Sequence, residues 1–296
     1  MPRIMMMSEL SGFVNIDKPV DWTSHDVVAR LRRVFNMKRI GHTGTLDPFA
    51  TGVLPIAVGS ATRLIRFLNK SKSYLAEIDL RNTTDTDDLT GESMRQRSGL
   101  MSEEEFCTKL LALKGTYDQI PPLYSAKKIK GKKLYELMRA GETIDLSELQ
   151  AKTITISDIK LLDFNYPLAQ FEVACSEGTY IRSIARDLGG HLIALRRTES
   201  NGFDIKSAVS IEELEDGDVR AEDLVLRAGD YLDLPEFEFD RKDVISLQQG
   251  RRVPILTNLS GDKYLKCLDS DKSLIGLASI LTEKGDLCIA QPLVIL

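Results

Sequence analysis

The sequence predicts an α+β protein that ends in a small all-β module. Strand and helix patterns are interleaved over the first 230 residues, without the regular strand–helix–strand units that indicate a parallel sheet. After residue 235 the pattern changes to short apolar runs separated by Gly, Asp, Ser and Lys. At 296 residues and 43% hydrophobic content, the chain can form one large domain or two smaller ones.

The first 80 residues contain three predicted strands and one helix. Gly12–Asp17 alternates weakly and predicts a strand. Ser24 is a candidate N-cap of the amphipathic helix that follows it. Gly41–Gly52 is too polar and too rich in glycine for a regular element, whereas Leu54–Val58 predicts a buried strand. Tyr74–Leu80 alternates in polarity and predicts a half-exposed strand.

Further along the chain, Ser102–Glu105 is a capping-box pattern that opens a helix ending near Gly115. Ile154–Phe164 and Leu168–Cys175 predict two strands. Thr179 is a candidate cap for a helix that reaches Leu188. We place a domain boundary near residue 236, and four short strands are predicted beyond it: Arg252–Leu256, Tyr264–Asp269, Leu274–Ile280 and Leu287–Leu296.

Charge is distributed unevenly along the chain. The net charge of −5 argues against a nucleic-acid partner, yet residues 1–74 hold 11 Lys or Arg against five Asp or Glu. Residues 120–142 hold six basic against two acidic side chains, while residues 208–245 hold four against 13. A phosphate backbone responds to the local potential, so the basic segments are compatible with RNA binding or with solvated faces.

Several classes of protein are disfavoured by composition. No run approaches the roughly 18 apolar residues of a membrane helix, and the start lacks the features of a secretory leader. Four cysteines without a CxxC pair and three scattered histidines argue against a disulfide framework or a metal site. We therefore expect a cytoplasmic protein without a metal, whose residues 1–11 form a flexible N-terminus.

Two polar motifs contain candidate reactive groups. Asp47 precedes Pro48 in the glycine-rich stretch, where an extended backbone can project its carboxylate into a cleft or close an Asx turn. Arg182 falls in the first turn of a predicted helix, where the helix dipole favours an acid. It is either paired with a carboxylate or a surface arginine.

A strand tyrosine and a lysine-rich segment are weaker candidates. Tyr74 stands at the head of its predicted strand, where packing is the ordinary role of such a side chain. Residues 127–133 hold five lysines between two tyrosines, a composition suited to phosphate binding and base stacking or to a solvated loop: Lys127, Lys128, Lys130, Lys132 and Lys133.

Taken together, six motifs in this order resemble the bacterial tRNA pseudouridine-55 synthases of the TruB family. The resemblance runs from about Gly12 to Phe203, and the β-rich tail fits the family's PUA-type module. The motifs are GFVNIDKPVDWTSHDVV, RIGHTGTLDPFATGVLPIAVG, SYLAEIDL followed by TTDTDDLTG, IPPLYSAKKIKGKKLYELMRAGE, CSEGTYIRSIARDLG and LRRTESNGF.

The resemblance implies a pseudouridine synthase fold with a mixed, mainly antiparallel central sheet. It implies a catalytic domain over residues 12–236, with an RNA-binding insertion at about 119–150, and a PUA-like RNA-binding domain over residues 237–296. The implied reaction isomerises uridine 55 in the T-loop of tRNA after base flipping. It needs no cofactor or metal and no obligate protein partner, and we expect a monomer.

The resemblance also assigns roles to individual residues. Asp47 is the implied nucleophile, Arg182 its ion-pair partner and Tyr74 the ring that stacks on the target base. The lysine-rich insertion is expected to close over bound RNA. Four further positions are implied to lie around the uridine: His42, Tyr180, Leu195 and Lys18.

Three other functions are compatible with parts of the sequence. A non-catalytic RNA-binding protein would use the same basic segments, but it has no need to combine Asp47, Tyr74 and Arg182. A related synthase could act on another RNA or inside a guide-RNA particle, although the complete domain and short tail favour an enzyme that acts alone. A hydrolase using Asp47 and His42 lacks a metal cluster and a Ser or Cys nucleophile.

Overall fold

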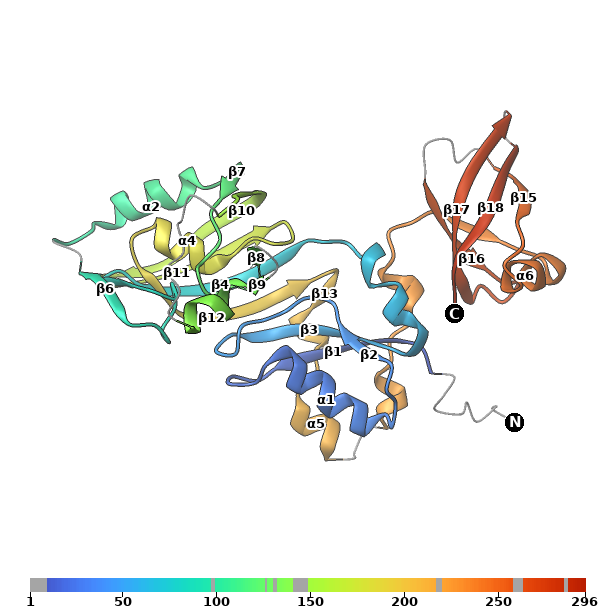
Figure 1. Cartoon of the computed structure of the whole chain (residues 1–296), viewed down its shortest axis with the longest axis horizontal. Helices are drawn as coiled ribbons and strands as arrows, with labels where there is room; N and C mark the ends of the chain where they lie inside the picture. The colour runs from blue at the N-terminus through green and yellow to red at the C-terminus, as the bar shows by residue number, and fades with distance from the viewer. Residues whose placement is uncertain are drawn as a thin grey trace.

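The computed structural model describes residues 10–96, 99–125, 127–129, 132–140, 149–216, 220–257, 263–284 and 287–296. The strands form a nine-stranded sheet and, near the C-terminus, a separate five-stranded sheet (Figure 1). Most of the expected flexible N-terminus lies outside the described residues. No helix in the described part of the chain is long and apolar enough to span a membrane.

The large sheet follows the order β1-β3-β12-β4-β11-β10-β7, with β2 paired to β3 and β13 to β12. Strands β3 and β12 run parallel, and all other neighbouring strands of this sheet are antiparallel. This order confirms the α+β class with a mixed, mainly antiparallel sheet. The strand bounds are β1 Gly12–Lys18, β2 Ile40–His42, β3 Thr51–Val58, β4 Lys72–Asp79, β7 Gly115–Gln119, β10 Lys152–Asn165, β11 Leu168–Cys175, β12 His191–Ser200 and β13 Phe203–Asp204.

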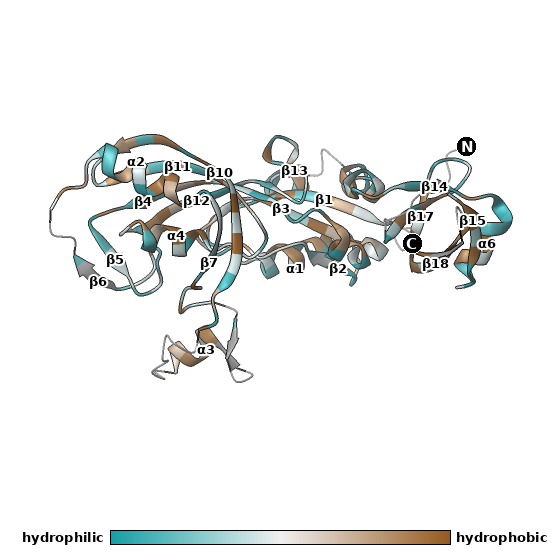
Figure 2. Ribbon diagram, turned by 90° about the horizontal axis from the view of Figure 1, so that it is seen from above, coloured by the Kyte–Doolittle hydropathy of each residue, from teal (hydrophilic) through white to brown (hydrophobic). Residues whose placement is uncertain are grey.

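Helices cover one face of this sheet, while on the other face a second apolar cluster buries Phe13 of β1 and Val53 of β3. Buried apolar residues of α1, α2 and α4 form the main core with Tyr74, Ala76 and Ile78 of β4. In Figure 2 the short α3 stands apart from the sheet. The helix bounds are α1 Ser24–Val34, α2 Glu103–Ala112, α3 Leu134–Arg139, α4 Ile181–Asp187, α5 Ile211–Glu215 and α6 Arg241–Gln248. Two small hairpins complete this part: β5 Asn82–Thr84 with β6 Ser93–Gln96, and β8 Lys128–Ile129 with β9 Lys132–Lys133.

The predicted caps of two helices are wrong. Helix α1 is capped by Thr23, whose hydroxyl accepts a hydrogen bond from the Asp26 N–H while the Asp26 carboxylate accepts one from the Thr23 N–H. Ser24 is instead buried and bonds to a neighbouring loop. Helix α4 has no side-chain cap at Tyr180, and the Thr179 hydroxyl donates to the Ser176 carbonyl 2.9 Å away. In both cases a hydroxyl that could cap finds another partner.

Gly41–Gly52, which was predicted to be irregular, lacks regular structure only between His42 and Thr51. Gly41 and His42 belong to β2 and pair with Ala57 and Ile56, and β3 begins at Thr51. A polar and glycine-rich stretch carries no strand signal of its own, because cross-strand pairing rather than propensity holds these residues.

The C-terminal sheet has the order β14-β16-β17-β18-β15. Its four longer strands match the predicted ones, while β14 and the helix α6 in the same segment were not predicted. The strand bounds are β14 Glu236–Glu238, β15 Val253–Leu256, β16 Tyr264–Leu268, β17 Leu274–Lys284 and β18 Leu287–Ile295.

An apolar cluster joins this sheet to the larger one. Leu277 of β17 and Val294 of β18 share a buried cluster with Phe13 of β1 and Val53 of β3. The Arg63 guanidinium donates to the Ile295 carbonyl across the same junction. The tail therefore packs against the turns that follow β3, where Phe67 also contacts Tyr264 edge to face.

Candidate active site

The Asp47 loop, residues 43–50 between β2 and β3, is held from both sides. The Ser24 hydroxyl accepts a hydrogen bond from the Leu46 N–H at 2.9 Å. The Lys18 ammonium donates to the Pro48 carbonyl at 3.1 Å. These bonds fix the residues immediately before and after Asp47, so its carboxylate is presented by a constrained backbone.

Arg197 of β12 holds the remainder of this loop. Its guanidinium is fully buried and donates to three carbonyls, those of Gly44 at 3.1 Å, Thr45 at 3.3 Å and Val53 at 2.7 Å. Gly52 has φ +102°, and a Cβ there would lie 2.2 Å from the Arg197 carbonyl oxygen. Only glycine permits this approach of the two backbones.

Arg182 of α4 pairs with Asp47. The Arg182 Nε lies 3.0 Å from Asp47 Oδ2, and Nη2 donates to Asp47 Oδ1 at 3.1 Å. The arginine side chain is 8% exposed and the aspartate 33%, so the carboxylate is the part of the pair that faces solvent. Arg182 also donates to the carbonyls of Thr86 and Tyr124 and lies 3.4 Å from Asp88 Oδ2.

The electrostatics of Asp47 combine opposing effects. Burial raises the pKa of the Asp47 carboxyl above its ordinary value, and the neighbouring Asp88 charge acts in the same direction. Arg182 and, more weakly, Lys18 lower that pKa. The ion pair therefore keeps an anion in a place where burial alone would favour the neutral acid.

Tyr74 is buried on β4, on the sheet face that the helices cover. Leu195 of β12 lies opposite Ala76 on that same face, in the same core. Burial raises the pKa of the Tyr74 phenol, and the charge and hydrogen bond of Arg197 oppose this rise. The phenol is therefore protonated at neutral pH.

His42 and Lys18 lie on either side of the same loop. The buried Nδ1 of His42 has no hydrogen-bond partner among the described residues, and burial together with Arg197 lowers the pKa of the imidazole. Lys18 is fully buried and donates to the carbonyls of Pro19, Trp22 and Pro48. Lys18 thus holds the Asp47 loop through the Pro48 carbonyl. Its direct contact with substrate stays a prediction.

Tyr180 joins the site through its backbone. The buried Gln119 side chain accepts from the Tyr180 N–H at 2.8 Å and donates to the Tyr180 carbonyl at 3.1 Å. The reciprocal pair fixes the entry to α4 two residues before Arg182. Gln119, rather than a cap at Thr179, therefore fixes the start of this helix.

The predicted basic insertion is described only in part. Lys127 donates to the Gln150 carbonyl. Lys128, Lys132 and Lys133 belong to the short strands β8 and β9, whose lysine side chains are outside the described atoms, and Lys130 lies outside the described residues. Their role in RNA binding stays a prediction.

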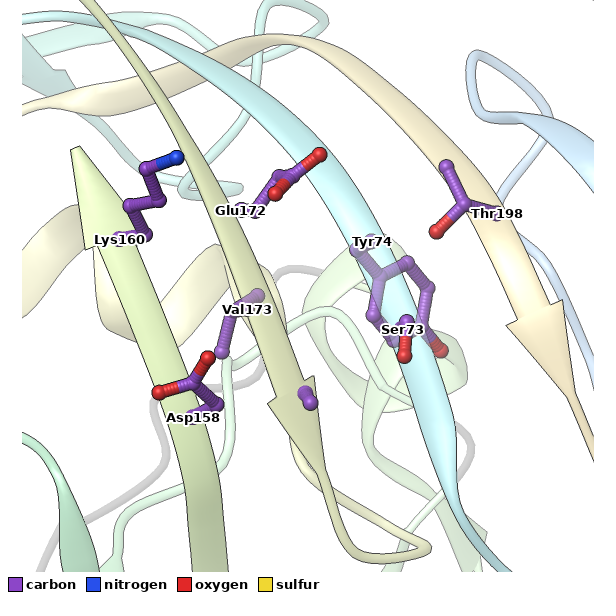
Figure 3. A pocket seen from close by; sticks show the side chains of 8 residues that line it. Ser73, Tyr74, Asp158, Lys160, Glu172, Val173 and Thr198 are labelled. Carbon is purple, nitrogen blue, oxygen red and sulfur yellow. The ribbon is translucent and has the colours of Figure 1, made fainter. Parts of the chain in front are cut away.

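An open pocket of about 270 Å³ lies on the other face of the sheet (Figure 3). Ser73, Lys160 and Glu172 line it on strands β4, β10 and β11. Because neighbouring residues of a strand point to opposite faces, Ser73 faces away from the side that buries Tyr74. Tyr74 also contributes to the lining of this pocket, but neither Asp47 nor Arg182 does.

Three residues of the site were not among those predicted. Asp88 and Arg197 fall within the quoted motifs TTDTDDLTG and LRRTESNGF, but a single sequence does not show which charged residue of a motif is buried. Gln119 gave no signal. Among the described residues, no group of three or more His, Cys, Asp or Glu side chains could hold a metal ion.

Comparisons with known proteins show which family the sequence resembles. A family described as "TruB family pseudouridylate synthase (N terminal domain)" matches residues 32–181. A tRNA pseudouridine synthase B of Trichormus variabilis is 49% identical over 216 residues, which cover 70% of this chain and 73% of the relative. The protein of the same name from Microcystis aeruginosa is 38% identical and covers 96% of this chain and 99% of the relative.

A solved structure supports the fold over nearly the whole chain. A chain of a Cbf5–Nop10–Gar1 complex superimposes with a TM-score of 0.72 at 24% identity, covering 96% of this chain and 84% of the other. The family match spans half of the sequence, and the match to the Microcystis aeruginosa protein extends over both sheets. The protein therefore belongs to the TruB family of pseudouridylate synthases.

Proposed function

We propose that this protein isomerises uridine 55 in the T-loop of tRNA to pseudouridine, with Asp47 as the nucleophile. The observation that carries the proposal is the Asp47–Arg182 pair, in which a buried cation directs a partly exposed carboxylate. The relatives named tRNA pseudouridine synthase B supply the substrate class.

The reaction needs an ionised carboxylate next to an extruded nucleotide. An Asp47 oxygen attacks either C1′ of the ribose or C6 of the uracil, and the glycosidic N1–C1′ bond breaks. The freed uracil turns, a C5–C1′ bond forms, C5 loses its proton and N1 gains one. Electrons and atoms balance without an oxidant, and the carboxylate is released unchanged.

Arg182 supports this step by holding the carboxylate ionised and oriented. The hydrogen bond from Nη2 to Oδ1 and the ion pair between Nε and Oδ2 orient the Asp47 carboxylate, and Asp88 in turn holds Arg182 on its other side. The lone pairs of Asp47 that do not face Arg182 remain available for attack.

Tyr74 provides the aromatic surface against which the target base packs. Its protonated phenol suits a ring that packs against an extruded uracil, because aromatic contacts offset part of the unstacking cost of a few kcal/mol. A role for Tyr74 in removing the C5 proton requires the phenol to lose its own proton first. His42, Tyr180 and Leu195 are proposed to complete the surroundings of the base.

The proposal includes an enzyme that works on the T-arm of tRNA without a protein partner. It is tested by incubating the purified protein with an unmodified tRNA transcript that carries tritium at C5 of uridine. Isomerisation releases the tritium, and chemical mapping locates the product. Pseudouridine at position 55 supports the proposal, whereas its absence there, or its formation only in another RNA, contradicts it.

A further inference from the structure

Lys72 of β4 is a cation of the site that none of the predicted roles uses. It precedes Tyr74 by two residues, so both side chains leave the strand on the same face. Their Cα atoms are about 7 Å apart, within the span of one nucleotide. A Cβ at Gly44 would lie 3.1 Å from the Lys72 ammonium, which places that ammonium against the Asp47 loop.

The surroundings of Lys72 contain more cations than anions. Arg197 and Lys152 act on its charge with the same sign, and Glu177 acts with the opposite sign. Glu177 is itself engaged, because its carboxylate pairs with Lys70 at 3.0 Å and its carbonyl accepts from Lys152 at 2.9 Å. Among the described residues, the Lys72 ammonium has no hydrogen-bond or ion-pair partner.

A charge held in this way is unfavourable until an anion arrives. Burial and the nearby Arg197 lower the pKa of Lys72 to about 8, so at pH 7 most molecules still carry the ammonium. A bound anion would offset both effects. The anion that an RNA-modifying site receives next to its target base is a backbone phosphate, and lysine binds phosphate as a compact point charge.

We propose that Lys72 is an RNA-binding residue that contacts a phosphate next to the target uridine while Tyr74 receives the base. The inference rests on the proposed function for the identity of the RNA. It adds a phosphate contact inside the site to the contacts expected from the lysine-rich insertion.

The first test compares single-charge variants in binding to a T-arm hairpin at several salt concentrations. Lys72→Met should weaken binding about tenfold and lower the slope of log Kd against log salt by about one, because the variant binds one phosphate fewer. Lys72→Arg should restore most of the affinity and slope. Lys160→Met removes the same charge from the opposite face of the sheet and should change neither.

The second test locates the phosphate. Single neutral methylphosphonates replace each phosphate around the target uridine, and each RNA is bound to wild type and to Lys72→Met. At one position adjacent to the uridine, the two changes should be strongly non-additive. Additive effects at every position, or a salt slope that Lys72→Met leaves unchanged, would overturn the proposal.

A purely structural role for Lys72 would give a different pattern. If Lys72 merely supports Gly44, Lys72→Met should lower the melting temperature and the single-turnover rate at saturating RNA, with affinity and salt slope intact, and the proposal would be wrong. Wild-type turnover on the same hairpin is measured separately. Binding that follows the expected pattern without formation of pseudouridine would count against the proposed function and leave the phosphate contact standing.

Discussion

Arg182 faces Asp47 side-on, with Nε 3.0 Å from Oδ2 and Nη2 3.1 Å from Oδ1. The two residues are 135 positions apart in the chain. One lies on a loop pinned by Lys18, Ser24 and Arg197, and the other on a helix whose entry Gln119 fixes. Because both backbones are constrained, the pair is positioned before any substrate binds.

This relationship predicts the acid limb of the pH profile. Burial raises the pKa of Asp47 in the free enzyme, and protonation would remove the nucleophile that we propose. As the pH falls, kcat/KM should therefore decline with an apparent pKa above about 3.9, the value of an ordinary aspartate. Single-turnover rates between pH 4 and 8 measure this limb.

Removing the Arg182 cation should shift the acid limb of the pH profile. In Arg182→Met only the weaker effect of Lys18 opposes burial, so the pKa of Asp47 rises further and the remaining activity should disappear at a higher pH than in wild type. Arg186→Met, one helical turn away on α4, removes an arginine that pairs with Asp87 and serves as the control. A limb that stays in place in Arg182→Met would show that Arg182 does not set the ionisation of Asp47.

Arg197 is expected to be irreplaceable by lysine. A lysine ammonium cannot reach the carbonyls of Gly44, Thr45 and Val53 with the same geometry, and each buried carbonyl left without a donor costs about 1–3 kcal/mol. Arg197→Lys should therefore lower both the free energy of unfolding and the turnover rate. Denaturant unfolding and single-turnover assays measure the two effects.

The neighbouring arginine provides the matched control. Arg196 is partly exposed and pairs with Asp17 at the surface, a contact that lysine can also make. Arg196→Lys should leave stability and rate close to wild type. Equal effects of the two substitutions would mean that the buried guanidinium has no special part in holding the loop.

The apolar junction between the two sheets predicts a loss of stability from a single substitution in the tail. Leu277 is fully buried in the apolar cluster at this junction, so Leu277→Ala should cost about 2–4 kcal/mol of unfolding free energy. Leu256→Ala removes a leucine that is 77% exposed and should change stability by less than about 0.5 kcal/mol. Calorimetric unfolding of the two variants and of wild type measures these differences in unfolding free energy.

The same junction changes what deletion of the tail is expected to do. For removal of residues 237–296, the sequence alone predicts a larger loss of affinity for whole tRNA than for a T-arm hairpin, because a separate module would touch RNA beyond the loop. The structure adds that the deletion removes Leu277 and Val294 from the apolar cluster that joins the two sheets. Leu277→Ala should therefore reduce activity on both RNAs near its melting temperature and on neither well below it.

The lysine-rich insertion predicts a salt effect of its own. Neutralising Lys127, Lys128, Lys130, Lys132 and Lys133 together should weaken tRNA binding and lower the salt slope by up to about one unit for each phosphate that these lysines bind. An unchanged slope would show that they form a solvated loop.

The secondary-structure elements and the fold class were predictable from local patterns. The contacts that hold the Asp47 loop and the start of α4 in place were not. Alternation and apolar runs predicted β1, β3, β11 and the longer C-terminal strands, because each buries one face or both. The caps at Thr23 and Tyr180 were missed, since Ser24 and Thr179 hydroxyls bond to distant or preceding backbone instead.

Asp47 and Arg182, which the structure pairs, were predicted because they lie in dense motifs, but the residues that hold them in place lie far away in the chain. Arg197 is 144 residues from the Val53 carbonyl that it contacts, and Gln119 is 61 residues from Tyr180. No local periodicity encodes such contacts. Whether an arginine is buried against carbonyls, as Arg197 is, or exposed, as Arg196 is, depends on register in β12.

The central claim is that the Asp47 carboxylate is the nucleophile, and its replacement tests this most directly. Asp47→Asn keeps the shape of the side chain and removes its negative charge, while Asp47→Ala guards against slow deamidation of the asparagine. Both variants should bind tRNA within about tenfold of wild type and release no tritium from C5-labelled uridine 55 in single-turnover reactions. Turnover by Asp47→Ala above a few per cent of the wild-type rate would contradict the claim.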